Sequence, residues 1–196
     1  MTDYCTQDDI EKYLDTTFDS NPDPSVSLII SHVSALIDAY CNRDFTLHEN
    51  VVEYYDGKGK GHNVIMLKNY PVTAVSEVVE DGTTLTENTH YVWFRDGRLV
   101  KVSNGYVDPN KWYWKAKVKA VKVTYSYGYS TVPTEIKTIC IQLCVEWLKK
   151  YPLKHAEAGI ASSISLNGVN ISYETPETLP EWAKTRLNKY KKNLHY

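Results

Sequence analysis

The clearest pattern of apolar and polar positions lies between Val118 and Tyr151, and its period changes partway along. From Val121 to Tyr127 every second residue is apolar, which is typical of a strand with one buried face. Beyond Gly128 and Pro133 the apolar residues recur every three or four positions, at Ile136, Ile139, Cys140, Leu143, Cys144, Trp147 and Leu148. This spacing predicts a helix at the centre of a core, with Pro133 fixing the φ angle at its start.

Two further helices are predicted in the first fifty residues. Thr6 and Asp9 have the spacing of a capping box, which starts a short helix. Asp23 and Pro24 begin a second helix, whose apolar residues again recur at helical intervals: Val26, Ile29, Ile30, Val33, Ile37, Tyr40 and Cys41. We expect this second helix to pack on the helix that follows Pro133.

Between these helices the apolar period is two, and turn signals arrive about every eight to twelve residues. This pattern predicts an inserted antiparallel β unit, with hairpin turns at Asp81-Gly82 and Asp96-Gly97. The expected strands are Val51–Tyr55, Asn63–Lys68, Val75–Glu80, His90–Phe94, Leu99–Val102 and Lys117–Tyr127. The tryptophans of this unit either fill a thin core or form an aromatic binding face, and core filling is the simpler interpretation.

The C-terminal residues carry apolar positions that need a surface to lie on. Alternating apolar residues flank Asn167-Gly168: Ile164 and Leu166 before it, and Val169, Ile171 and Tyr173 after it. This pattern predicts a hairpin, and because an isolated hairpin is marginal in water it needs its own sheet or the sheet edge of a neighbouring subunit. A last helix follows Leu179-Pro180, with Trp182, Leu187 and Tyr190 on one side.

The predicted fold class is therefore α+β. A small helical bundle is expected from residues 1–50 and 130–153, an inserted antiparallel β unit from 51–129, and a C-terminal arm of hairpin plus helix from 154–196. A chain of 196 residues is long enough to bury a sizeable core without disulfides or a structural metal.

Charge excludes some classes of protein. The formal net charge of −2 argues against a main role in gripping nucleic acid. The bases of the last helix, Lys184, Arg186, Lys189, Lys191 and Lys192, form either a solvated face or a docking surface for an acidic partner or passing DNA. No export signal and no membrane association are expected, because the N-terminus is acidic and the apolar runs are short.

No catalytic, cofactor or metal site is expected from the motifs. Cys140 and Cys144 stand one helical turn apart, but both belong to the apolar stripe and are interpreted as small buried side chains. The segment 56–61, DGKGKG, lacks the Ser or Thr and the helix that a phosphate loop requires, and is expected to be a glycine-rich hairpin loop. The six histidines are scattered outside recognisable motifs.

The order of several segments resembles the head–tail connectors of tailed bacteriophages, also called adaptor or head-completion proteins. The segments that carry the resemblance are Ser34–Phe45, Tyr55–Gly57, Leu67–Val75, Asp81-Gly82, Val123–Tyr129, Val132–Lys137, and Ser163–Tyr173 followed by Leu179-Pro180 and a short basic helix. Each segment alone is weakly specific, and their succession covers most of the chain.

The resemblance implies a structural virion protein without enzymatic activity or cofactor, which forms a dodecameric ring beneath the portal protein. The ring would lie in the virion neck after assembly in the host cytoplasm, would extend the channel through which genomic DNA passes without sequence-specific binding, and would contact a stopper or tail-completion protein. A near-neutral charge suits such a conduit, because many phosphate contacts would hold the DNA.

The residues expected to contact the portal or a neighbouring subunit belong to the C-terminal arm: Ile164, Leu166, Val169, Ile171, Tyr173, Trp182, Arg186, Tyr190 and Lys191. Two alternatives remain open from the sequence. One is a carbohydrate- or cell-surface-binding phage module that uses Trp93, Trp112 and Trp114, and the other is an enzyme with an unrecognised hydrolytic site.

Overall fold

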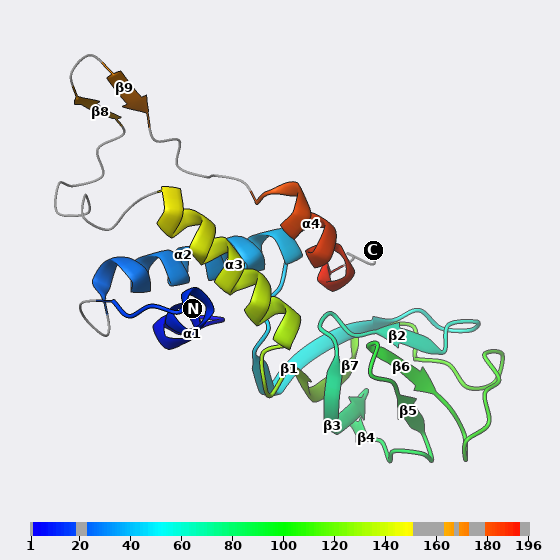
Figure 1. Cartoon of the computed structure of the whole chain (residues 1–196). Coiled ribbons are helices and arrows are strands. Elements are labelled where there is room, and N and C mark those ends of the chain that lie inside the picture. Colours follow the sequence, from blue (N-terminus) through cyan, green and yellow to red (C-terminus); the bar gives the residue numbers. More distant parts are fainter. Residues whose placement is uncertain (1, 19–22, 151–162, 167–168, 173–178, 193–196) are drawn as a thin grey trace. The chain divides into compact units, whose positions relative to one another are not determined.

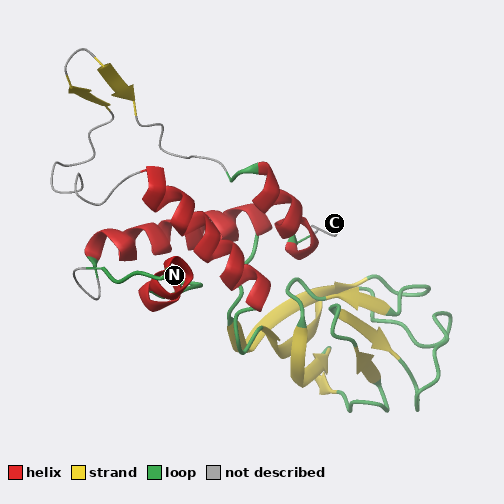
Figure 2. Ribbon diagram, in the orientation of Figure 1, coloured by secondary structure: helices red, strands yellow, loops and turns green. Residues whose placement is uncertain are grey.

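The computed structural model describes residues 2–18, 23–150, 163–166, 169–172 and 179–192 (Figure 1). It contains helices and antiparallel sheets, so the predicted α+β class is confirmed (Figure 2). The chain divides into two compact units. Met1–Asp44 and Val132–Leu194 form a helical unit, and Phe45–Thr131 form a β unit.

The helical unit begins with two capped helices, as the sequence predicts. In α1 (Gln7–Leu14) the Asp9 amide donates to Thr6 Oγ1 at 3.2 Å and the Thr6 amide donates to Asp9 Oδ2 at 2.9 Å, which completes the capping box. In α2 (Pro24–Cys41) the Asp23 carboxylate accepts the Ser25 amide at 2.8 Å, and Pro24 occupies the first helical position.

The apolar stripes of α2 and α3 (Thr134–Lys150) supply most of the buried residues of the helical unit. Those of α2 are Val26, Ile30, Val33, Ile37 and Cys41, and those of α3 are Ile136, Ile139, Cys140, Leu143, Cys144 and Val145. Among the described residues α2 is also the one helix long and apolar enough to cross a membrane, a property that the core helices of globular proteins share. The buried apolar stripe of α2 is what a core helix of a globular protein shows.

The last helix, α4 (Glu181–Leu187), belongs to this bundle and continues into a 3₁₀ turn at Asn188–Tyr190. Leu179, Ala183 and Leu187 are buried within the chain itself. The sequence-based picture of one C-terminal arm over 154–196 therefore needs correction: small and aliphatic side chains at 179, 183 and 187 form a helical seam that its own bundle covers.

The β unit contains two antiparallel sheets. The first has the strand order β1 (Leu47–Gly57), β7 (Lys117–Gly128), β3 (Val72–Glu80) and β4 (Thr83–Thr84). The second has the order β2 (Val64–Met66), β6 (Arg98–Lys101) and β5 (Tyr91–Trp93). The six expected strands are all present. β4 is an additional short strand, and β1 begins four residues early because it continues past a bulge near Asn50 to pair Leu47 with Gly128.

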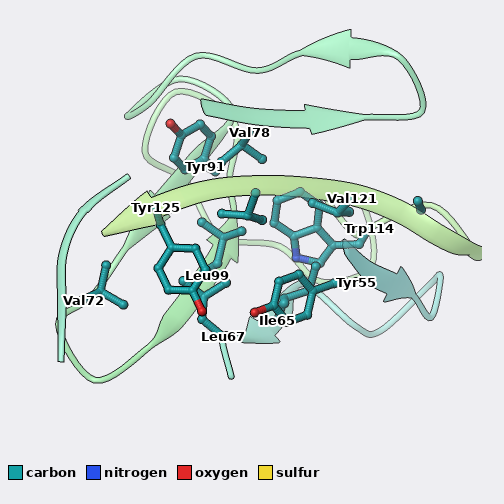
Figure 3. Packing of buried hydrophobic residues seen from close by; sticks show 12 residues of the cluster. Tyr55, Ile65, Leu67, Val72, Val78, Tyr91, Leu99, Trp114, Val121 and Tyr125 are labelled. Carbon is teal, nitrogen blue, oxygen red and sulfur yellow. The ribbon is translucent and has the colours of Figure 1, made fainter. Parts of the chain in front are cut away.

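One apolar core fills the β unit and takes side chains from both sheets (Figure 3). Val121, Val123 and Tyr125 of β7 are fully buried, which confirms the alternation expected for this strand. Trp114 is only 1% exposed, and its indole Nε1 donates to the Asn63 carbonyl at 2.8 Å. This tryptophan therefore fills the core, and its one polar atom has a partner.

The chain enters and leaves the β unit at adjacent positions. The Tyr129 amide donates to the Thr46 carbonyl at 3.2 Å, and the Phe45 and Tyr129 rings lie 5.8 Å apart. Gly128 has φ +102°, and a Cβ added there would lie 1.9 Å from the Thr46 carbonyl oxygen. Only glycine fits this crossing without displacing backbone.

Gly128→Ala should therefore lower the free energy of unfolding by roughly 2–5 kcal/mol, as the sum of positive-φ strain and overpacking. The urea-unfolding midpoint measures this loss. Gly105→Ala is a matched control, because Gly105 also has positive φ but has nothing within 4 Å of an added Cβ. Equal losses in the two variants would mean that the contact with Thr46 does not constrain the crossing.

Candidate partner-binding site

The expected binding residues on α4 make contacts with α3 of the same chain. Trp182 Nε1 donates to Glu146 Oε1 at 3.1 Å, and Arg186 Nη1 donates to Gln142 Oε1 at 2.9 Å. Both α4 side chains are half-buried, so part of each remains at the surface of the bundle. The inner sides of Trp182 and Arg186 thus fix α4, and their outer sides are open to a partner.

Glu135, in the first turn of α3, contacts three side chains of the C-terminal segment. It forms ion pairs with Lys189 and with Arg186, whose Nε lies 3.6 Å away, and it accepts the Tyr190 hydroxyl at 3.1 Å. These contacts hold the pKa of Glu135 below its ordinary value, with the Lys189 hydrogen bond as the largest cause. The same bond raises the pKa of Lys189. Two of the bases expected to face solvent or a partner are thus engaged internally.

A second group of contacts joins α4 and its 3₁₀ turn to the end of α2. The Tyr40 hydroxyl donates to Asn188 Oδ1 at 2.6 Å, and the Lys191 ammonium lies 4.9 Å from the centre of the Tyr40 ring. The Lys192 amide donates to the Cys41 carbonyl at 2.8 Å. Lys191 itself is exposed, so its charge is available at the surface.

Sequence reasoning missed Glu135, Gln142 and Tyr40 as the internal partners of α4. No local signal identifies them, because each contact joins residues more than forty positions apart. The lysine-rich pattern is typical of a solvated helix whether or not an acid from another helix approaches it.

The predicted hairpin is present as β8 (Ser163–Leu166) and β9 (Val169–Ser172). Its register pairs Ile164 with Ile171 and Leu166 with Val169, so these four positions share one face. Ser163, Ser165, Asn170 and Ser172 occupy the other face. Tyr173 lies outside the described residues. The hairpin is therefore amphipathic in register, and among the described strands β8 and β9 pair only with each other.

The aromatic residues of the β unit do not form the single face that carbohydrate binding would need. Trp114 is in the core and Trp93 is half-buried against it, whereas Trp112 is 40% exposed. Exposed Tyr106 and Tyr113 lie on the same connecting segment as Trp112. This segment supplies an exposed aromatic surface, but not one built from the three predicted tryptophans.

The glycine-rich segment 56–61 connects β1 to β2, which belong to different sheets, so it is a loop between sheets and not a hairpin. It lies against the aromatic segment, where the Gly59 amide donates to the Trp114 carbonyl at 3.0 Å and the Gly61 amide donates to the Pro109 carbonyl at 2.9 Å. The charges of Lys115 and Lys117, which follow the aromatic segment, are partly neutralised by Asp81. Asp81 binds Lys115 and Lys117 at 2.9 and 2.5 Å, and the two hydrogen bonds lower the pKa of Asp81 to about 2.

Among the described residues one cluster has the side chains to hold a metal. The Sγ atoms of Cys5, Cys140 and Cys144 lie within 4.8 Å of one another, and all three cysteines are buried. The sequence identified the pair on α3 but not Cys5, which precedes the Thr6 cap and approaches α3 only in the folded chain.

The candidate site consists of contact surfaces: an amphipathic hairpin, the outer side of α4 and the edge strand β1. Surfaces of this kind are what the subunits of a structural assembly use to bind one another. The chain belongs to the head completion protein family, whose family model matches residues 4–193. This membership confirms the resemblance seen in the sequence. The protein is a head–tail connector of the virion, and no finding supports the carbohydrate-binding alternative.

A solved structure described as "Neck of empty GTA particle computed with C6 symmetry" contains a chain similar to this one, with a TM-score of 0.46 and 9% identity. The similarity covers 96% of this chain and 90% of that chain. No curated protein matches the sequence.

Glu135→Gln should make the free energy of unfolding less dependent on pH as the pH falls below 4.5, the ordinary pKa of a glutamate. The folded pKa of Glu135 is lowered, so its contribution is present above the unfolded pKa and is lost as the pH falls through the folded pKa. Urea unfolding at a series of pH values measures the slope.

Glu181→Gln is the control for this prediction. Among the described residues Glu181 forms an ion pair with Lys184 alone, three positions away, and its side chain is 85% exposed. An unchanged slope in Glu135→Gln would show that the Glu135 contacts do not hold α4 in solution.

Proposed function

We propose that copies of this chain close into a ring beneath the portal protein, with the β8–β9 hairpin of each copy docked on the next. The observation that carries the proposal is the register of the hairpin, which places Ile164, Leu166, Val169 and Ile171 on one face. A two-stranded hairpin with one aliphatic face is marginal in water. A partner that covers this face stabilises both the hairpin and the assembly.

The edge strand β1 is the surface that we propose for this hairpin, on a neighbouring copy. β1 is eleven residues long and pairs with β7 on one side, and no described strand pairs with it on the other. Val52 and Tyr54 are exposed along it. An added strand would satisfy main-chain groups at this edge and bring aliphatic side chains to exposed apolar ones.

Such a contact joins two different patches of the same chain, the hairpin on one copy and β1 on the next. Interfaces of this kind are heterologous, and they generate a closed ring when the rotation between copies divides a full turn. The dodecameric stoichiometry follows the family resemblance. In this proposal genomic DNA passes through the central channel, and the net charge of −2 leaves the subunit without an excess of positive charge that would retain the DNA.

The outer surface of α4 supplies the second contact in this proposal, with the portal. The inner sides of Trp182, Arg186 and Tyr190 are held by α3, so their outer sides are presented in a fixed position next to exposed Lys191. A fixed cationic and aromatic surface suits an acidic partner, because little side-chain entropy is lost on binding. A stopper or tail-completion protein would bind the opposite side of the ring.

The role that we propose is structural and not catalytic. The groove of about 360 Å³ in the β unit is lined by Glu49, Arg95 and Tyr129, by serine and threonine hydroxyls, and by small and apolar groups. Among the residues that the structure describes, its lining contains no histidine, cysteine or lysine, the side chains that most often activate a nucleophile, so it is not a recognisable hydrolytic site.

The test of hairpin docking uses two matched double variants on opposite faces of the hairpin. Leu166→Ser with Val169→Ser should abolish assembly onto portal-bearing heads, whereas Ser165→Ala with Asn170→Ala should leave it intact. Addition of the purified protein to heads that lack it, scored by tail attachment and electron microscopy, measures assembly. Deletion of the whole C-terminus is unsuitable, because α4 covers the bundle.

Both variants should retain the circular-dichroism spectrum and melting temperature of the parent, since α4 is held by contacts outside the hairpin. Heads completed equally well by the two variants would show that the aliphatic face of the hairpin is not the docking surface. The mass of the complex with the portal then gives the number of copies in the ring.

A further inference from the structure

Three cysteine thiols converge inside the helical unit from two distant parts of the chain. Cys140 and Cys144 stand one turn apart on α3, and Cys5 immediately precedes the capping box of α1. Cys5 Sγ lies 3.4 Å from Cys140 Sγ, and the three sulfur atoms lie within 4.8 Å of one another. All three side chains are at most 5% exposed.

The position of Cys5 is fixed by contacts that do not involve sulfur. The Tyr4 amide donates to Ser34 Oγ of α2 at 3.1 Å, and the Thr6 amide donates to Asp9 Oδ2 at 2.9 Å. Main-chain bonds therefore hold Cys5 on both sides, and the thiol points at α3.

We propose that Cys5, Cys140 and Cys144 bind one thiophilic d¹⁰ cation. Thiolate sulfur is the soft ligand that Cu⁺ and Zn²⁺ prefer. Ligands at about 2.3 Å from a common ion lie roughly 4 Å from one another. The distance from Cys5 Sγ to Cys140 Sγ is 3.4 Å and no separation within the set exceeds 4.8 Å, so small rotations of the side chains bring the three sulfur atoms to an ion between them.

The surroundings favour three-coordinate binding of Cu⁺. The Ser34 hydroxyl lies 3.7 Å from Cys140 Sγ and is a further oxygen donor beside the cluster. Zn²⁺ in structural sites takes four ligands and would have to recruit this hydroxyl or a water. Comparison of the two ions distinguishes these geometries.

The thiols must lose their protons when the ion binds. Hydrogen bonding with Cys144, Cys5 and Ser34 lowers the pKa of Cys140, with Cys144 as the largest cause. The same interaction with Cys140 raises the pKa values of Cys5 and Cys144. The protons of the three thiols pass to solvent as the ion binds.

Bound metal would join the beginning of α1 to the middle of α3. These elements are far apart in the sequence and otherwise meet through packing and the ion pair between Lys137 and Asp9 at 2.9 Å. An ion held by both would stabilise the folded state in proportion to its occupancy, because the unfolded chain does not present the three sulfurs together.

The experiment titrates the reduced full-length protein with Cd²⁺, whose bonds to thiolate absorb in the ultraviolet. One ion per chain and a raised melting temperature are expected. Separate arms measure Cu⁺ without oxygen and Zn²⁺ against chromophoric chelators, and tighter binding of Cu⁺ is expected. Cys5→Ser should weaken binding by more than about 100-fold, since loss of a ligand exceeds loss of an outer-shell partner.

Cys41→Ala is the matched control, because Cys41 is equally buried in the bundle but lies outside the cluster. The proposal is overturned if Cys5→Ser binds Cd²⁺ as tightly as the parent, or if Cys41→Ala loses as much affinity. If Cys5→Ser fails to fold, the absorbance per Cd²⁺ in the parent counts the sulfur ligands, and fewer than three overturns the proposal.

Discussion

Pairing between β1 and β7 is the constraint on which the rest of the structure depends. The two strands are the entry and exit of the β unit, and their register brings Leu47 opposite Gly128. Because the ends of the insertion are held side by side, α2 and α3 can belong to one bundle although the whole β unit separates them in the sequence. The entropy of closing so long a connection is offset by the ladder itself.

The bundle and the β unit present surfaces of different composition. The bundle holds α4 by polar contacts on its rim and by the buried seam at 179, 183 and 187, so side chains of the C-terminal segment are presented from a fixed base. The β unit keeps Trp114 for its core and leaves edge strand β1 and the segment around Trp112 at the surface. Fixed surfaces of different composition are what a subunit needs to meet several partners.

Periodicity was sufficient to predict the elements, because each helix and strand is specified by its own neighbours in the sequence. Thr6 and Asp9 cap α1, and Asp96-Gly97 joins β5 to β6, as their local chemistry requires. Contacts between distant residues were not predictable. Nothing beside Glu135 indicates Arg186 or Tyr190, and nothing beside Cys5 indicates α3. The same limit explains why the sequence predicts that a partner covers the last helix: an apolar seam looks alike whether its own bundle or a partner covers it.

The hydrogen bond from Lys192 to Cys41 has a consequence for biogenesis. During translation α2 is synthesised before the β unit, α3 and α4. The Cys41 carbonyl at the end of α2 therefore cannot accept the Lys192 amide until nearly all of the described residues have left the ribosome. The β unit can fold during synthesis, whereas the bundle cannot be completed before its last helix emerges.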